Sequence, residues 1–471
     1  MKLRHRLLVC TALALAALPL RAQAVSAAEA APIRSLRMND LPEVLQVPAS
    51  LAVGTDGKTA GDALNLRNAV IQGLGYSPDV RAARFRAESF EQTQRAARGA
   101  LLPRVELRAA VGRGHLESAD PPVSLPRKDG SAQLTQALVD ESSRREWRRQ
   151  GVLADSALRQ VDGAESTAGL EVAGAYLQAL QSRLTIEVSQ GYETLLAELL
   201  RYVSERAAGG GASAADRERV RARVANARAN IADGRAGLNV ALRNLERLVG
   251  QAPARLDVGG PASLGIPADL NAAKALALAQ NADLRAARAE VDAADWARAS
   301  AQARFLPKLS LEVSHSRNVN AAGTESYFRD TKAMVVLSVP LANGGTDLAQ
   351  MRAAVAQREE KTALALAVER KLLQELDAAY ANLEAVAERY RSVREELDAD
   401  RAVVKAFQAQ LTAANRSLLD VLDAYQRLYQ TQLDMTSLVI GETQNHLKVA
   451  HLTGTLMGAL VTAPAADKPA P

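Results

Sequence analysis

The side chains best placed to do chemistry are two carboxylates near the C-terminal end of the sequence. Asp420 and Asp423 lie three residues apart, so on a helix they share one face and place two negative charges side by side. Ser417 precedes Asp420 by three residues, the spacing of a helix-capping box, and acidic residues suit a helix N-terminus. Ser213 and Asp216 repeat this spacing earlier in the chain. Capping accounts for Asp216 and for part of Asp420, but it gives Asp423 no structural reason.

The remaining reactive residues do not form a catalytic or metal-binding set. His446 and His451 are five residues apart, off a common helical face, and no cysteine accompanies them. The sequence contains no Ser/His/Asp set, Cys/His pair or dinucleotide fingerprint. The run Gly209-Gly210-Gly211 lacks the Gly-Lys-Ser/Thr of a phosphate loop and suits a sharp reversal, because positive φ costs glycine little. We therefore predict a protein with no enzymatic activity, cofactor or metal.

The composition excludes a nucleic-acid partner. The 471 residues carry a formal net charge of +5, with acidic and basic residues interspersed along the chain. This pattern is typical of solvated helical surfaces rather than of a basic binding patch. Only 3% of the residues are aromatic, which leaves few side chains on which bases could stack.

Residues 1–24 have the pattern of a secretory signal peptide. A basic start is followed by a short apolar stretch and by a small-residue motif that ends at Ala24. The single cysteine, Cys10, lies inside the apolar stretch, so we expect a mature chain without thiol, disulfide or acyl anchor. Residues 25–59 are expected to be extended or disordered. The mature protein is thus predicted to act beyond the inner membrane.

The sequence contains an internal duplication with a constant offset of 204 residues. Asp79–Arg84 reappears at 283–288, and Leu102–Leu107 reappears at 306–311. Chance similarity would not keep one register over such a distance. The predicted parts are a first repeat at 60–254, a linker at 255–267, a second repeat at 268–460 and a disordered tail at 461–471.

Each repeat is predicted to run through the same elements: a helix, two strands and a helical hairpin. The first helix, at about 60–100 or 268–304, ends at a Leu-Pro step, because proline stops a helix. Alternating apolar and polar residues then indicate strands long enough to cross a bilayer when tilted. A helix on the order of 100 Å long follows and reverses at a tip. The predicted strands lie at about 103–114, 131–140, 307–316 and 331–341, and the hairpin tips at about 208–213 and 412–417.

This order of elements predicts a mainly α-helical fold with a small antiparallel β part and long coiled-coil hairpins. Beyond the signal peptide, no stretch approaches 18 uninterrupted apolar residues, so an integral protein would have to cross lipid as a closed barrel. Four strands cannot close a barrel, whereas three chains would supply twelve, enough to surround a passage. We therefore predict a homotrimer with a 12-stranded β-barrel and an α-helical tube outside the membrane.

The most specific stretch is Arg416–Ala424, Arg-Ser-Leu-Leu-Asp-Val-Leu-Asp-Ala, which is followed by a closing motif at Gly454–Leu456. Both resemble the last hairpin of the TolC-type outer-membrane efflux protein family. Leu337–Leu341 resembles the strand-exit motif of that family, although Ala342 stands where an aromatic residue is expected. The resemblance covers about 60–460. It implies an outer-membrane exit duct that extends through the periplasm and works with a periplasmic adaptor and an inner-membrane pump or ABC exporter.

The resemblance also implies roles for residues at the hairpin tips. Asp420 and Asp423 of three chains would form a ring that constricts the periplasmic entrance, favours cations and helps to gate it. Arg416 would tie neighbouring hairpins together, with Asp216 as a plausible partner; a solvated charge contributing under about 1 kcal/mol is the alternative. Leu411 occupies the position of a gate tyrosine, which favours an apolar contact there. The candidate adaptor-docking residues are Gly209, Gly210, Gly211, Asn415 and Ser417.

Two functional questions stay open at this point. A non-conducting periplasmic coiled-coil adaptor or scaffold is the alternative to a duct, although adaptors carry one hairpin and a lipoyl-like segment rather than duplicated strand pairs. Within the duct hypothesis, the cargo is either small toxic molecules or polypeptides. The stretch Arg416–Ala424 and the short tail lean towards the secretion branch.

Overall fold

The structure is a computed structural model that describes residues 63–116, 123–253, 255–257, 264–320, 325–412 and 417–462. The predicted signal peptide, the segment at 25–59 and nearly all of the predicted tail lie outside these ranges. Asn415 and Arg416, at the tip of the second hairpin, lie outside them as well.

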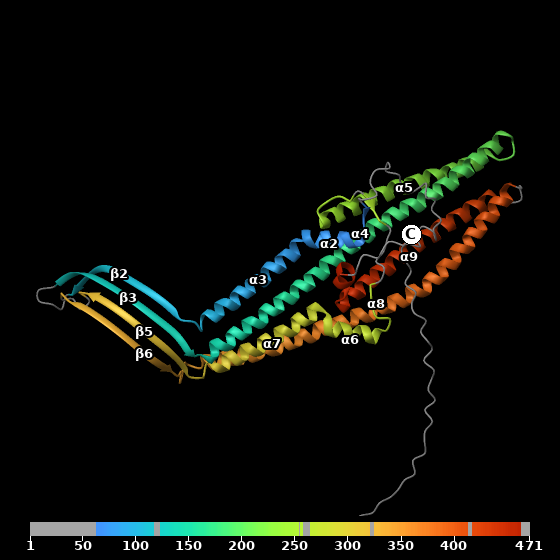
Figure 1. The fold of residues 1–471 in the computed structure, drawn as a ribbon. Coiled ribbons are helices and arrows are strands. Elements are labelled where there is room, and N and C mark those ends of the chain that lie inside the picture. The colour runs from blue at the N-terminus through green and yellow to red at the C-terminus, as the bar shows by residue number, and fades with distance from the viewer. Residues whose placement is uncertain are drawn as a thin grey trace, which may run out of the picture. The chain divides into compact units, whose positions relative to one another are not determined.

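The described chain is mainly helical and consists of two copies of one series of elements, as Figure 1 shows. The first copy comprises α2 (Leu66–Tyr76), α3 (Pro78–Gly99), β2 (Arg104–Leu116), β3 (Val123–Val139), α4 (Glu141–Ala208) and α5 (Ala214–Val249). The second comprises α6 (Leu270–Gln280), α7 (Ala282–Ala303), β5 (Lys308–Val319), β6 (Tyr327–Ser338), α8 (Thr346–Thr412) and α9 (Leu418–Thr453). Short elements complete the described chain: β1 (Ala63–Leu64), β4 (Arg255–Leu256) and the π-helical turn η3 (Gly458–Thr462).

The first predicted helix of each repeat is in fact two helices. The chain breaks at Ser77, between α2 and α3, and at Asn281, between α6 and α7. The Ser77 side chain accepts a hydrogen bond from the backbone N–H of Val80, and Asn281 accepts one from Leu284. Serine and asparagine compete for backbone donors in this way, so they end one helix and cap the next. The prediction of single helices at 60–100 and 268–304 was therefore wrong.

The four long strands form one antiparallel sheet in the order β2-β3-β5-β6. The ladder between β2 and β3 continues to the pair Leu116↔Val123, so β3 begins well before the predicted residue 131. Strand β6 runs from Tyr327 to Ser338 rather than from 331 to 341. Backbone pairing extends these strands into polar segments, and Pro340, which has no N–H to donate, follows the end of β6. Strands β2 and β6 are the two edges of the sheet.

The helices of each copy form a long hairpin. Helix α4 packs on α5, helix α8 packs on α9, and the two hairpins meet where α4 contacts α9. Helices α4 and α8 contain 68 and 67 residues, so each is on the order of 100 Å long. The main hydrophobic core runs along these contacts. Among the described residues, no helix is both long and apolar enough to span a membrane.

A tyrosine on each long helix fixes the short segments that precede each copy. The Tyr176 hydroxyl lies 3.0 Å from the Leu64 carbonyl oxygen and also contacts that of Asp257. Its counterpart Tyr380, 204 residues later, donates a hydrogen bond of 2.6 Å to the Pro267 carbonyl. Burial raises the pKa of Tyr176, so the hydroxyl stays protonated as a donor.

Candidate gate at the hairpin tips

The tip of the first hairpin is a glycine turn followed by a capped helix. Helix α4 ends at Gly209, and Gly210 has a φ of +74°, a conformation that glycine adopts without steric cost. The Ser213 hydroxyl then accepts a hydrogen bond of 3.0 Å from the backbone N–H of Asp216. The Asp216 carboxylate lies 3.3 Å from Arg219, one turn further along α5.

The second tip presents the two predicted gate carboxylates at the start of α9. Ser417 caps this helix, and its hydroxyl accepts a hydrogen bond of 3.3 Å from the backbone N–H of Leu419. Asp420 is half-buried and Asp423 is exposed. Arg416 lies outside the described residues, so its contact with Asp216 stays a prediction.

A tyrosine of the first hairpin holds the second hairpin near the tips. The Tyr202 hydroxyl, on α4, donates a hydrogen bond of 3.1 Å to the carbonyl oxygen of Leu411, near the end of α8. Arg206 donates to the same hydroxyl at 3.1 Å and lies over the tyrosine ring. The Leu411 side chain is partly buried against the main core. The contact at position 411 is thus apolar through its side chain and polar through its main chain.

Sequence reasoning did not identify Tyr202. It searched for a tyrosine at position 411, whereas the tyrosine lies on the opposite hairpin. The available signal was the spacing of Tyr202 and Arg206, four residues apart at the end of a long helix, where an arginine can pack over an aromatic ring.

Two stacked tyrosines join the hairpins further from the tips. The rings of Tyr192, on α4, and Tyr429, on α9, are 4.5 Å apart and nearly parallel. The Tyr192 hydroxyl donates to the Gln426 side chain at 2.7 Å, and Ser189 lies 3.1 Å from the Tyr429 hydroxyl. Burial raises the pKa of Tyr192. These contacts hold α9 against α4 at a level further from the hairpin tips than the gate residues.

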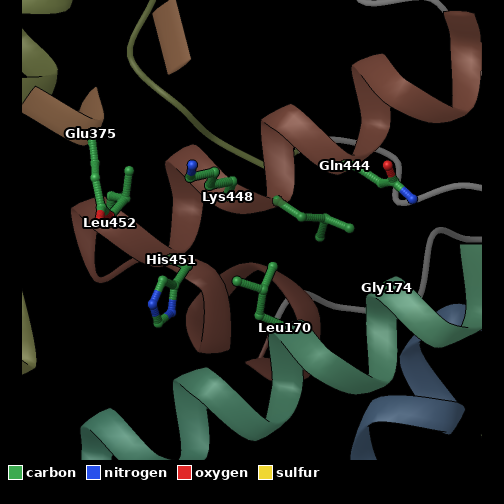
Figure 2. Close-up of a pocket in the computed structure, with 8 residues that line it drawn as sticks. Leu170, Gly174, Glu375, Gln444, Lys448, His451 and Leu452 are labelled. Carbon is green, nitrogen blue, oxygen red and sulfur yellow. The ribbon is translucent and has the colours of Figure 1, made fainter. Parts of the chain in front are cut away.

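A groove of about 480 Å³ lies between α4, α8 and α9. Figure 2 shows the side chains that line it. Leucines form its apolar lining, with Glu375 from α8 and Lys448 from α9 beside them. His451, at the same groove, has its Nδ1 2.7 Å from the Ser166 hydroxyl. Burial lowers the pKa of His451, against the opposing effect of Asp283 and Glu375. Within the described ranges, no group of three or more metal-ligating side chains comes together.

Comparisons with known proteins agree with this architecture. The sequence profile of the family described as outer membrane efflux protein matches the chain twice, at residues 71–251 and 275–454. The alkaline protease secretion protein AprF of Pseudomonas aeruginosa is 28% identical over 398 residues, which cover 79% of this chain and 81% of AprF. The outer membrane protein TolC of Escherichia coli is 24% identical over 433 residues, covering 87% and 86% of the two chains. The solved structure of VceC from Vibrio cholerae has a TM-score of 0.72 at 17% identity and covers 83% of this chain and 96% of that one.

The chain therefore belongs to the outer membrane efflux protein family, and the two matched segments correspond to its two copies. It is an exit duct of the outer membrane with a periplasmic extension, of the kind used in efflux and secretion. This result confirms the resemblance seen in the sequence and favours a duct over a non-conducting scaffold. The mainly helical fold with a small antiparallel sheet is confirmed as well.

Proposed function

We propose that three copies of this chain form the outer-membrane duct of a type I secretion system. The observation that carries the proposal is the four-stranded sheet, in which the outer side of each edge strand, β2 and β6, pairs with no other strand of the described chain. Edge strands expose unpaired backbone groups, which lipid cannot satisfy. Pairing β2 of one copy with β6 of the next satisfies both edges, and three copies give a 12-stranded β-barrel.

The side chains of the sheet support a lipid-facing surface. Val105, Leu107 and Val111 of β2 are all more than two-thirds exposed, and Val111 reaches 81%. Val335, on the other edge strand, is 63% exposed. Polar residues alternate with them along the strands. This alternation is what a barrel needs, with apolar residues towards lipid and polar residues towards its interior.

Asp420 and Asp423 form the periplasmic gate in this proposal. They lie at the start of α9, near the tips, and three copies would bring six carboxylates together at the entrance. Such a ring attracts cations and raises the barrier to anions. Arg416 restrains the closed state, with Asp216 as its partner in place of Arg219. The tip residues Gly209, Gly210, Gly211, Asn415 and Ser417 are the docking surface for a periplasmic adaptor.

The cargo in this proposal is a polypeptide, and the inner-membrane partner is an ABC exporter. The support is the relationship to AprF, a protein named for secretion of an alkaline protease, at 28% identity over 398 residues. The arrangement of four strands and two hairpins serves small molecules equally well in principle. Polypeptide cargo would be tested by co-expressing the duct with the protease and exporter of such a system, and small-molecule cargo by drug accumulation.

Recording single channels from purified protein in planar bilayers tests the duct. We expect discrete cation-preferring conductances, and we expect Asp420→Ala with Asp423→Ala to lower the cation preference. Asp233→Ala, on exposed α5, is the matched control and should leave selectivity unchanged. An absence of conductance would overturn the duct, whereas unchanged selectivity in the double variant would remove only the gate ring.

A further inference from the structure

Helix α9 is enclosed by its neighbours except along one polar strip. Its contacts are with α8, α4 and α6, and most of its residues are buried. The exposed positions recur at intervals of three and four residues, or of seven, which places them on one side of the helix. The strip includes Asp423, Arg427, Gln430, Asp434, Gln444 and Lys448.

The chemistry of this strip differs from that of the other exposed helix faces. On α5 the exposed side carries eight arginines, but also a large apolar side chain, Val240, that is 71% exposed. On α8 the exposed side combines charged residues with Leu364 and Leu366, both about half exposed. Exposed apolar side chains of this size suit packing against protein, because burial removes them from water. From Asp423 onwards, the α9 strip contains no exposed large apolar side chain in the described residues, so it suits contact with water.

We infer that the α9 strip lines the conduit and that Asp434 forms a second carboxylate ring beyond the gate. The inference rests on the proposed gate, because Asp423 is the first member of the strip. Asp434 follows Asp423 by eleven residues, or about three helical turns, so both carboxylates face the same way about 16 Å apart. No salt bridge within the described part of the chain includes Asp434. Its charge is therefore available to passing ions.

The order of charges along the strip defines what it selects. The negative Asp423 and Asp434 flank the positive Arg427, and Lys448 closes the strip beside the groove of Figure 2. Between Asp434 and Lys448 the exposed side chains, Ser437 and Gln444, are polar and uncharged. Two acidic rings on either side of a basic one favour small cations while keeping each local field modest. A polypeptide can pass along such a surface, because the strip offers few apolar side chains that would retain it.

Cysteine accessibility tests where the strip faces. The only cysteine of the sequence, Cys10, lies in the predicted signal peptide, so Ser437→Cys and Gln444→Cys each introduce one reactive thiol into the mature chain. Asp233→Cys is the matched control, because Asp233 is the duplicate of Ser437 on exposed α5. A sulfonate-bearing thiol reagent should reduce the single-channel conductance of both strip variants about twofold or more. It should label Asp233→Cys, as checked by mass, without changing its conductance.

Selectivity separates this inference from the proposed gate. Asp434→Asn, with Asp420 and Asp423 intact, should lower the cation preference measured from reversal potentials. The lining role is overturned if the strip cysteines react without changing the current, or fail to react. The second ring is overturned if Asp434→Asn leaves the reversal potential unchanged, while the double gate variant still shifts it. If no variant conducts, including the unmodified protein, the proposed function itself fails.

Discussion

Helices α5 and α9 are copies of one another, yet they have different surroundings. Each has 36 residues, follows a serine cap and ends at a glycine with positive φ, Gly250 or Gly454. Helix α9 is buried against several helices, whereas α5 packs mainly on α4. Eight arginines and four carboxylates make α5 basic, while α9 has two basic and four acidic residues. Duplication has kept the helix ends, and the two faces have diverged to suit a central and a peripheral position.

Glycine is needed at the ends of both helices, because the backbone there has a positive φ and a Cβ would collide with its neighbours. Gly454 has a φ of 77°, and a Cβ there would lie 2.8 Å from the Gln280 carbonyl oxygen. Beside it, the Asn281 side chain donates to the carbonyl of Leu452 at 3.1 Å. Helix α9 therefore ends directly against the start of α7. A Cβ at Gly250 would meet the ring of Tyr76 at 2.7 Å in the same way.

The largest effect is expected when α9 receives a residue of α5. Val439 is 2% exposed, and its duplicate on α5 is the exposed Arg235. Val439→Arg buries an unpaired charge and should destabilise the fold by more than about 4 kcal/mol. The reverse change, Arg235→Val, should stay within about 0.5 kcal/mol. Thermal unfolding in detergent measures both, with protease resistance as the readout if Val439→Arg does not fold. Equal tolerance of the two variants would contradict the central position of α9.

Replacing the anchoring tyrosine of the first copy should cost more stability than replacing that of the second copy. Tyr176→Phe removes the contacts of a buried hydroxyl with two carbonyl oxygens, those of Leu64 and Asp257, and should cost roughly 1–3 kcal/mol. Tyr380→Phe removes one bond at a less buried site and should cost about 1 kcal/mol. Denaturant midpoints compare the two variants directly. A larger loss for Tyr380→Phe would mean that the second copy, not the first, is held more firmly by its preceding segment.

The contact between hairpins near the tips should control opening. Tyr202→Phe removes the hydrogen bond to Leu411, worth about 1 kcal/mol, and should raise the ratio of open to closed channels about fivefold. Tyr425→Phe is the control, because it removes a bond to Gln408 inside the second hairpin. Open-time distributions from single-channel records distinguish them. If both variants open equally often, the bond between the hairpins has no special role.

The smallest effect concerns pH. Burial lowers the pKa of His451, so the folded protein favours the neutral ring, while the unfolded chain takes up a proton near the ordinary pKa of about 6.5. The contribution of the neutral His451 ring to stability is thus fully present above about pH 6.5, and it is lost as the pH falls below that value. His451→Gln should flatten this decline only in part, since burial lowers the pKa of His446 as well. The matched control is Arg247→Gln, the same replacement at the duplicate position on α5, and its unfolding curves should keep the full pH slope.

Local signals in the sequence were sufficient for the duplication, the Leu-Pro helix ends and the serine caps. The breaks at Ser77 and Asn281 carried signals too, since both residues are strong caps, but the helical periodicity on either side obscured them. The start of β3 could not be predicted, because pairing with β2 sets it rather than any alternation in its own residues. Tyr202 was missed for a related reason. Its partner is a main-chain carbonyl on another hairpin, and a carbonyl leaves no trace in the sequence.

The mass of the detergent-extracted particle tests the central claim most directly, because a four-stranded sheet with two open edges can enclose a passage only together with other copies. One full-length chain has a mass of 50.1 kDa. Light scattering with the detergent contribution subtracted should give close to three mature chains per particle. A stable particle of a single chain would contradict the duct and would leave the edges of β2 and β6 to some other partner.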